Sequence, residues 1–74
     1  MSRYRVDYLT PRQERILHVI RQAITDEGVA PTVAEIAEAV GLRAGSSVHY
    51  QLRELETKGA IRREPHQPRG IRLA

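Results

Sequence analysis

The chain has 74 residues, no cysteine, and a net charge of +3 from 12 Lys and Arg against 9 Asp and Glu. This length predicts one small domain, and the missing cysteines exclude disulfide bonds and thiolate metal sites. Because no apolar run approaches the ~20 residues of a membrane span and the start of the chain is too polar for a secretory signal, we expect a cytoplasmic protein with no membrane partner.

Positive charge is concentrated in the second half of the chain. Residues 41–74 hold seven Lys and Arg against three Glu, a balance of +4, whereas residues 1–40 hold five Arg against six Asp and Glu, a balance of −1. Eleven of the 12 basic residues are Arg, whose planar guanidinium donates two parallel hydrogen bonds to phosphate or guanine. This distribution indicates a face for a polyanion, although an ordinary solvated surface can carry the same charge.

The first segment, residues 1–8, shows no helical period, and we expect a flexible basic arm in front of a domain that occupies residues 9–74. A helix is predicted next, because Thr10 and Gln13 form the pattern of a capping box and Gly28 supplies a left-handed end. Between these ends, apolar residues recur at helical spacing and predict the buried side of the helix: Ile16, Leu17, Ile20, Ala23 and Ile24.

A second, short helix is predicted between Thr32 and Gly41. Thr32 and Glu35 form another capping box, and Gly41 ends the helix after about two turns. Its apolar residues again have helical spacing: Val33, Ile36, Ala37 and Val40. Only residues 41–45 separate this helix from the next one, a connection short enough for a helix-turn-helix.

A third helix is predicted over residues 46–58, followed by Gly59 as its end. Two residues are candidates for its N-cap: Ser46, which is chemically the better one, and Gly45. At 100° per residue, one side of this helix is apolar and faces the core: Val48, Leu52 and Leu55. The other side is polar, with Ser47 beside it and His49 at its flank: Ser46, Tyr50, Arg53 and Thr57.

The tail, residues 60–73, changes from helical to alternating periodicity. Pro65 and Pro68 exclude a central strand between the two alternating segments, so a β-hairpin with a proline-containing loop is predicted. The expected fold is therefore mainly α with a small hairpin, a winged helix-turn-helix of three helices plus a two-stranded wing.

In a helix-turn-helix the second helix enters the major groove of DNA. We therefore expect four residues of the third helix to read bases: Ser46, Ser47, His49 and Tyr50. Five basic residues are expected at the DNA backbone: Arg43, Arg53, Lys58, Arg63 and Arg69. Arg62 and Arg72 also lie on the hairpin and are expected to meet phosphates, with the loop tip near the minor groove. Glu54 would repel phosphate, so it either accepts from a cytosine amine or pairs with Lys58.

Blander interpretations exist for the same residues. Ser46 and Ser47 could serve only as helix caps, and His49 and Tyr50 could be ordinary surface residues. An enzyme would need a nucleophile with its base in a pocket, and RNA binding usually needs stacked aromatic side chains, of which only Tyr50 is suitably placed. A protein-interaction winged helix would present an apolar outer face. The three histidines, His18, His49 and His66, lack metal-ligand spacing, so no metal, cofactor or small-molecule ligand is expected.

Several motifs together resemble the N-terminal DNA-binding domain of the LexA repressor family. They begin at Leu9-Thr10-x-Arg12-Gln13 and continue with Pro31-Thr32-x-x-Glu35-Ile36, Val40-Gly41-Leu42, Ser46-Ser47-Val48-His49-x-x-Leu52-x-x-Leu55-Glu56-x-Lys58-Gly59 and Ile61-Arg62-Arg63-x-Pro65-x-x-Pro68-Arg69. The Ser-Ser-Val-His segment is more similar to Gram-positive and actinobacterial members than to enteric ones. Ala44 and Gly45 depart from the polar or proline residues that many members carry there.

The resemblance implies a homodimer that binds palindromic operators and represses DNA-damage (SOS) genes in the bacterial nucleoid. It also implies base reading by Ser46, Ser47, His49 and Tyr50. Family repressors continue into a second domain with a Ser/Lys self-cleavage dyad, whereas the only lysine here is Lys58, which matches a helix end. We therefore expect no enzyme activity, and either an excised domain or a stand-alone relative, including a winged-helix regulator outside the SOS response.

Overall fold

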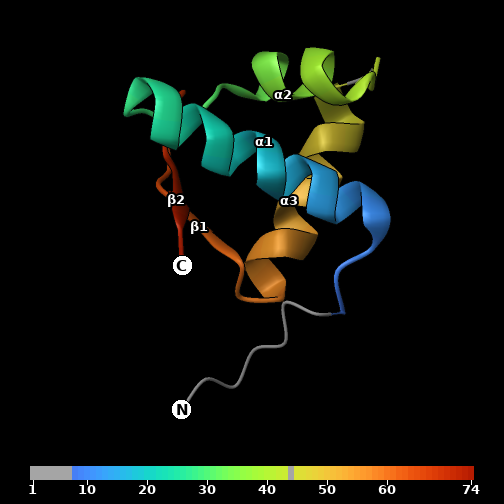
Figure 1. Ribbon diagram of the computed structural model, residues 1–74. Coiled ribbons are helices and arrows are strands. Elements are labelled where there is room, and N and C mark those ends of the chain that lie inside the picture. The colour runs from blue at the N-terminus through green and yellow to red at the C-terminus, as the bar shows by residue number, and fades with distance from the viewer. Residues whose placement is uncertain (1–7, 44) are drawn as a thin grey trace.

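The computed structural model describes residues 8–43 and 45–74. Three helices are followed by a two-stranded hairpin, as Figure 1 shows: α1 (Pro11–Glu27), α2 (Val33–Val40), α3 (Gly45–Thr57), β1 (Ile61–Arg63) and β2 (Ile71–Leu73). This is the element order predicted for a winged helix-turn-helix. Of the expected basic arm, all but Tyr8 falls outside the described ranges. Within these ranges, no helix is both long and apolar enough to cross a bilayer.

Both predicted capping boxes form at the starts of α1 and α2. The Thr10 hydroxyl accepts from the Gln13 amide at 3.1 Å, while the Thr10 amide donates to the Gln13 side-chain oxygen at 3.1 Å. The Thr32 hydroxyl accepts from the Glu35 amide at 3.1 Å, and the Thr32 amide donates to the Glu35 carboxylate at 2.9 Å. The two helices end at the expected left-handed glycines: Gly28 (φ 78°) and Gly41 (φ 76°).

The boundaries of α3 differ slightly from the prediction. The helix begins at Gly45, so both N-cap candidates, Ser46 and Gly45, lie inside its first turn and the N-cap prediction is wrong. Position 44, directly in front of the helix, lies outside the described residues. At the other end, α3 stops at Thr57, and Gly59 has the positive φ of 82° that helix termination requires.

One hydrophobic core joins all the elements. The apolar sides predicted for the helices supply most of it, and both strands contribute: Leu9, Ile16, Leu17, Ile20, Ala30, Ile36, Val48, Leu52, Leu55, Ala60, Ile61 and Ile71. Five of the predicted apolar residues are only partly buried, and all of them except Ala23 pack against the edge of the core: Ala23, Ile24, Val33, Ala37 and Val40. The core therefore fixes how α3 packs against α1 and α2.

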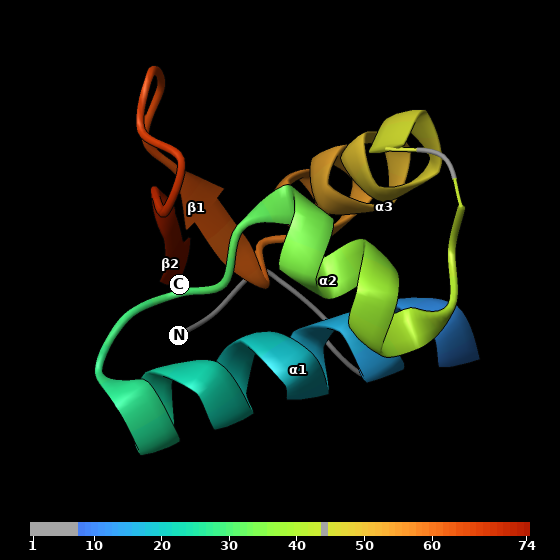
Figure 2. The same cartoon turned by 90° about the horizontal axis from the view of Figure 1, so that it is seen from above.

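The two strands pair antiparallel and form the wing. Ile61 stands opposite Leu73, Arg62 opposite Arg72, and Arg63 opposite Ile71. Because side chains alternate along a strand, Arg62 and Arg72 share one side of the hairpin, and the buried Ile61 and Ile71 share the other. In Figure 1 the wing lies on one side of α3 and the start of α1 on the other, and Figure 2 shows the wing to the left of α3 and α1 below it.

Candidate nucleic-acid interface

The orientation of α3 leaves its polar side free. Val48, Leu52 and Leu55 are each 0% exposed, whereas Tyr50 is 56% exposed. The other described polar residues of this side are exposed as well: Ser47, His49, Arg53 and Thr57. We call this side the polar face of α3. Ser46 belongs to the first turn of the helix by its backbone, but its side chain lies outside the described part of the chain.

Two of the predicted backbone-contacting residues lie on α3 or shortly before it in the chain. Arg53 is exposed on α3 itself, and Arg43 is exposed in the connection between α2 and α3. In the described ranges neither guanidinium makes an ion pair, since the ion pairs there join Arg69 with Glu35 and Arg72 with Glu64. Both arginines thus present their charge to solvent.

Arginines of the wing occupy both sides of the hairpin. Arg62 and Arg72 stand directly opposite each other on one side, and like charges in that position repel. The Arg72 guanidinium donates to the Glu64 carboxylate at 3.5 Å, which offsets part of this repulsion. Arg63 lies on the other side and is half-buried. The wing therefore carries several guanidinium groups close together, as its sequence predicted.

Arg69, expected at the DNA backbone, has partners inside the molecule. Its guanidinium makes two parallel 2.9 Å hydrogen bonds to the Glu35 carboxylate and a third, also 2.9 Å, to the Ala30 carbonyl oxygen. The hydrogen bond from Arg69, helped by the Thr32 amide, lowers the pKa of Glu35 from 4.5 to about 2. Arg69 thus fastens the wing to the start of α2. A phosphate contact by Arg69 stays a prediction, and it would have to coexist with these bonds.

Lys58 is also held by the protein. Its ammonium donates to the Gln13 side-chain oxygen at 2.7 Å and to the Tyr8 carbonyl oxygen at 3.4 Å, and it lies 5.2 Å from the centre of the Tyr8 ring. The side-chain nitrogen of Gln13, Nε2, donates in turn to the side-chain oxygen of Gln51 at 3.1 Å. The end of α3 is therefore joined to the start of α1. Lys58 bonds to Glu54 only through the backbone, at 2.9 Å, and its ammonium makes none of the described hydrogen bonds or ion pairs to the Glu54 carboxylate.

Sequence reasoning missed this joint, although one signal for it exists. Gln13 precedes Ile16, Leu17 and Ile20 at the spacing of one helix side, so it continues the buried stripe, and it is only 4% exposed. A buried amide at that position needs polar partners from another element. For Arg69 and Glu35 no comparable signal exists, because 34 residues separate them.

Comparison with known proteins gives the family. Residues 6–70 match the model of the LexA DNA binding domain. The chain belongs to the LexA DNA-binding domain family.

Similar members of the LexA family are repressors from actinobacteria. The chain is 54% identical over 65 residues to the LexA repressor of Frankia casuarinae and 52% identical over 65 residues to that of Mycobacterium leprae, in each match over 88% of this chain. It is 52% identical over 63 residues to the LexA repressor of Corynebacterium efficiens, over 85% of this chain. The chain spans only about a quarter of the length of these relatives, namely 25%, 28% and 27%.

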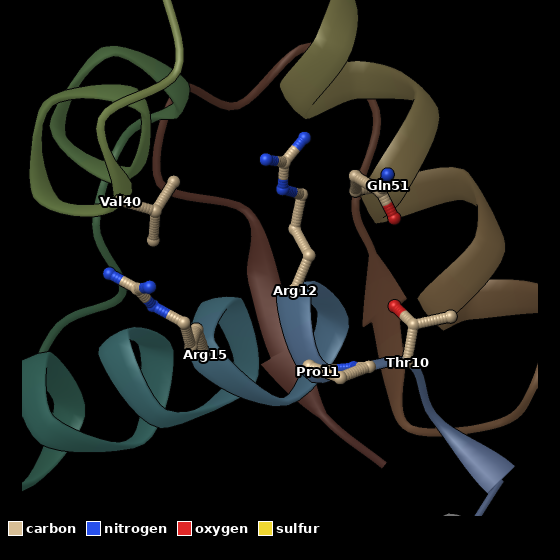
Figure 3. Close-up of a pocket in the computed structure, with 6 residues that line it drawn as sticks. All are labelled: Thr10, Pro11, Arg12, Arg15, Val40 and Gln51. Atoms are coloured by element: carbon tan, nitrogen blue, oxygen red, sulfur yellow. The ribbon is translucent and has the colours of Figure 1, made fainter.

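This LexA-family domain has one further cationic feature beside α3. A hollow of about 510 Å³ lies where the start of α1, the end of α2 and the middle of α3 meet. Six residues line it: Thr10, Pro11, Arg12, Arg15, Val40 and Gln51. Figure 3 shows Arg12 extending between the end of α2 and α3, with Arg15 turned towards Val40. No group of three or more His, Asp or Glu residues in the described ranges could hold a metal ion.

Proposed function

We propose that this LexA-family domain binds a specific sequence of double-stranded DNA and acts in transcriptional repression of DNA-damage genes. The observation that carries the proposal is the division of α3 into a buried apolar side and an exposed polar face with a guanidinium. A protein-docking helix would expose apolar residues instead. The family match and the LexA repressors among the relatives support the same class of function.

In this proposal α3 enters the major groove and its N-terminal half reads base edges. Ser46, Ser47, His49 and Tyr50 carry hydroxyl, imidazole and phenol groups that donate to and accept from bases. Arg43, Arg53 and Arg63 neutralise phosphates on either side, which positions the helix without reading sequence.

Lys58 and Arg69 keep a place in the proposal because each retains hydrogen-bond donors. A guanidinium has five N–H donors, and Arg69 uses three of them on Glu35 and Ala30. The Lys58 ammonium has three donors and uses two, on Gln13 and Tyr8. In this proposal both side chains contact the DNA backbone with their remaining donors, and their internal hydrogen bonds fix their positions before binding.

We further propose that two copies bind one palindromic operator. A two-fold operator lets each copy place α3 in a major groove, with half-sites about 34–36 Å apart or a multiple of that spacing. The LexA repressors are three to four times longer than this chain. In this proposal, residues outside the DNA-binding domain supply further dimer contacts. A repressor of this kind acts in the cytoplasm, at the nucleoid.

Selection of bound sequences from a random duplex library tests this function. We expect one enriched motif with inverted-repeat symmetry, and displacement of the labelled motif by duplex DNA but not by single-stranded RNA. A His49→Ala/Tyr50→Ala double variant, checked for folding by circular dichroism, is the control and should lose the enrichment. If the unmodified chain enriches no motif, the proposed function is wrong. Equal displacement by RNA would favour an RNA-binding role instead.

A further inference from the structure

The hollow beside α3 contains two arginines without a described role. Arg12 and Arg15 are both exposed on α1, three residues apart, and therefore neighbours on one side of the helix. None of the six residues lining the hollow is acidic, and Glu14, which lies between the two arginines in sequence, is not among them. In the described ranges the ion pairs involve Arg69 and Arg72, not these two.

This arrangement is unfavourable without a partner. Neighbouring like charges on a helix repel each other, and Arg12 lies in the first turn of α1, where the helix dipole favours negative charge. The residue of α3 that lines the hollow does not neutralise the two arginines, because Gln51 is uncharged and accepts a hydrogen bond from Gln13. An anion between the two guanidinium groups would relieve the repulsion, and Arg is suited to phosphate by its planar donor fork.

The position of the hollow identifies the source of this anion. A helix in the major groove has a phosphate strand along each of its two flanks. In Figure 1 the wing lies on one side of α3 and the start of α1 on the other. Gln51, which lines the hollow, is four residues from Ser47, so the hollow borders the polar face of α3 directly.

We propose that Arg12 and Arg15 bind a backbone phosphate of the same duplex that α3 reads, on the strand opposite the one that the wing contacts. The inference rests on the proposed DNA binding and adds a second phosphate clamp to it. With the wing on one flank and the arginine pair on the other, α3 is held between two strands, which fixes its depth and rotation in the groove.

Salt-dependent binding of single variants tests the clamp on the duplex selected by the unmodified chain. We expect Arg12→Gln and Arg15→Gln each to bind roughly tenfold more weakly and to lower the slope of log K against log [salt] by about 0.9 per lost contact. Arg21→Gln is the matched control, because Arg21 is exposed on the same helix and does not line the hollow. It should keep the affinity and slope of the parent, and Arg12→Lys should keep the slope.

Methylphosphonate substitution locates the phosphate. A neutral methylphosphonate at the contacted position should weaken binding of the parent chain but not of an Arg12→Gln/Arg15→Gln double variant, which has already lost both contacts. Thermal melting checks that Arg12→Gln and Arg15→Gln are folded. The inference is overturned if these folded variants match Arg21→Gln in slope and affinity. If instead the parent chain prefers no duplex at all, both the proposed function and the clamp are wrong. The two failures are therefore distinguishable, because the first result leaves specific DNA binding intact and the second does not.

Discussion

Glu35 shows how much one side chain does in a small domain. Its carboxylate accepts from the Thr32 amide as part of a helix cap, and from the Arg69 guanidinium as part of the wing attachment. The helix cap alone does not require a glutamate, since glutamine also completes a capping box. The ion pair with Arg69 requires the negative charge, and this makes the attachment of the wing sensitive to acid.

Acid should weaken the fold through Glu35. Its pKa is about 2 in the folded domain against 4.5 ordinarily, mainly because Arg69 donates to the ionised form. The unfolded chain therefore takes up the proton first, so this stabilisation is complete above about pH 4.5 and is lost as the pH falls towards 2. Denaturation between pH 2 and 6 should show less pH dependence for Glu35→Gln than for the parent. A side-chain carboxyl resonance of Glu35 that titrates near 4.5 by NMR would contradict this.

Gly70 is required in the wing by space. A Cβ there would lie 2.6 Å from the Glu64 carbonyl oxygen and 3.0 Å from the Gln67 Cβ, and the backbone oxygen cannot move away easily. We expect Gly70→Ala to destabilise the domain by about 1–3 kcal/mol, as overpacking does. Gly28→Ala is the contrasting variant, because nothing lies within 4 Å of its Cβ and only its φ of 78° is unfavourable. Hydrogen exchange should locate the first effect in the β1–β2 pair and the second at the end of α1.

At the scale of elements, local sequence determines where α1 and α2 begin and end. Thr10 and Thr32 each form a cap with a residue three positions later, so these boundaries could be predicted from a few neighbouring residues. The start of α3 could not be predicted as well, since Gly45, Ser46 and Ser47 all suit a helix start and local chemistry does not choose among them.

Joints between elements were not predictable in the same way. The stripe of Val48, Leu52 and Leu55 correctly predicted which side of α3 is buried, but the partner of Lys58 depends on how α3 crosses α1. Position in the last turn suggested only an interaction with the helix end or with Glu54. The same limit applies to Arg69, whose charge suggested a phosphate contact but did not reveal Glu35 as its partner within the fold.

Gln13 is expected to contribute as a joint and not only as a cap. Gln13→Ala removes the acceptor of Lys58 and the donor to Gln51, and we expect a loss of about 1–3 kcal/mol in the free energy of unfolding. Gln22→Ala, on the same helix, loses only an exposed 3.4 Å hydrogen bond to Asp26 and should change stability by less than about 0.5 kcal/mol. Urea denaturation of both variants compares them directly, and equal losses would show that the joint adds nothing.

For the whole molecule, the proposed reading and anchoring functions occupy different elements. His49 lies on the polar face of α3 and Arg63 on the wing. We expect His49→Ala to change which operator base is preferred, by roughly 1–3 kcal/mol of discrimination. Arg63→Gln should weaken specific and nonspecific duplexes about equally and lower the salt slope by about 0.9.

Binding titrations on the selected site, on its single-base variants and on unrelated DNA separate these two effects. A change of base preference in Arg63→Gln, or none in His49→Ala, would contradict the assignment. Arg63 is a better choice than Arg69 for this test, because a variant at Arg69 also detaches the wing from Glu35.

The bond between Arg69 and Glu35 also constrains how such domains can be recombined. A hairpin transplanted from this chain into another winged helix would bring its arginine but leave the carboxylate behind, because the two residues belong to separate modules. The grafted hairpin would then lack this ion pair and could change its angle at the segment after the third helix. Engineers who exchange wings between repressors should therefore move position 35 together with position 69.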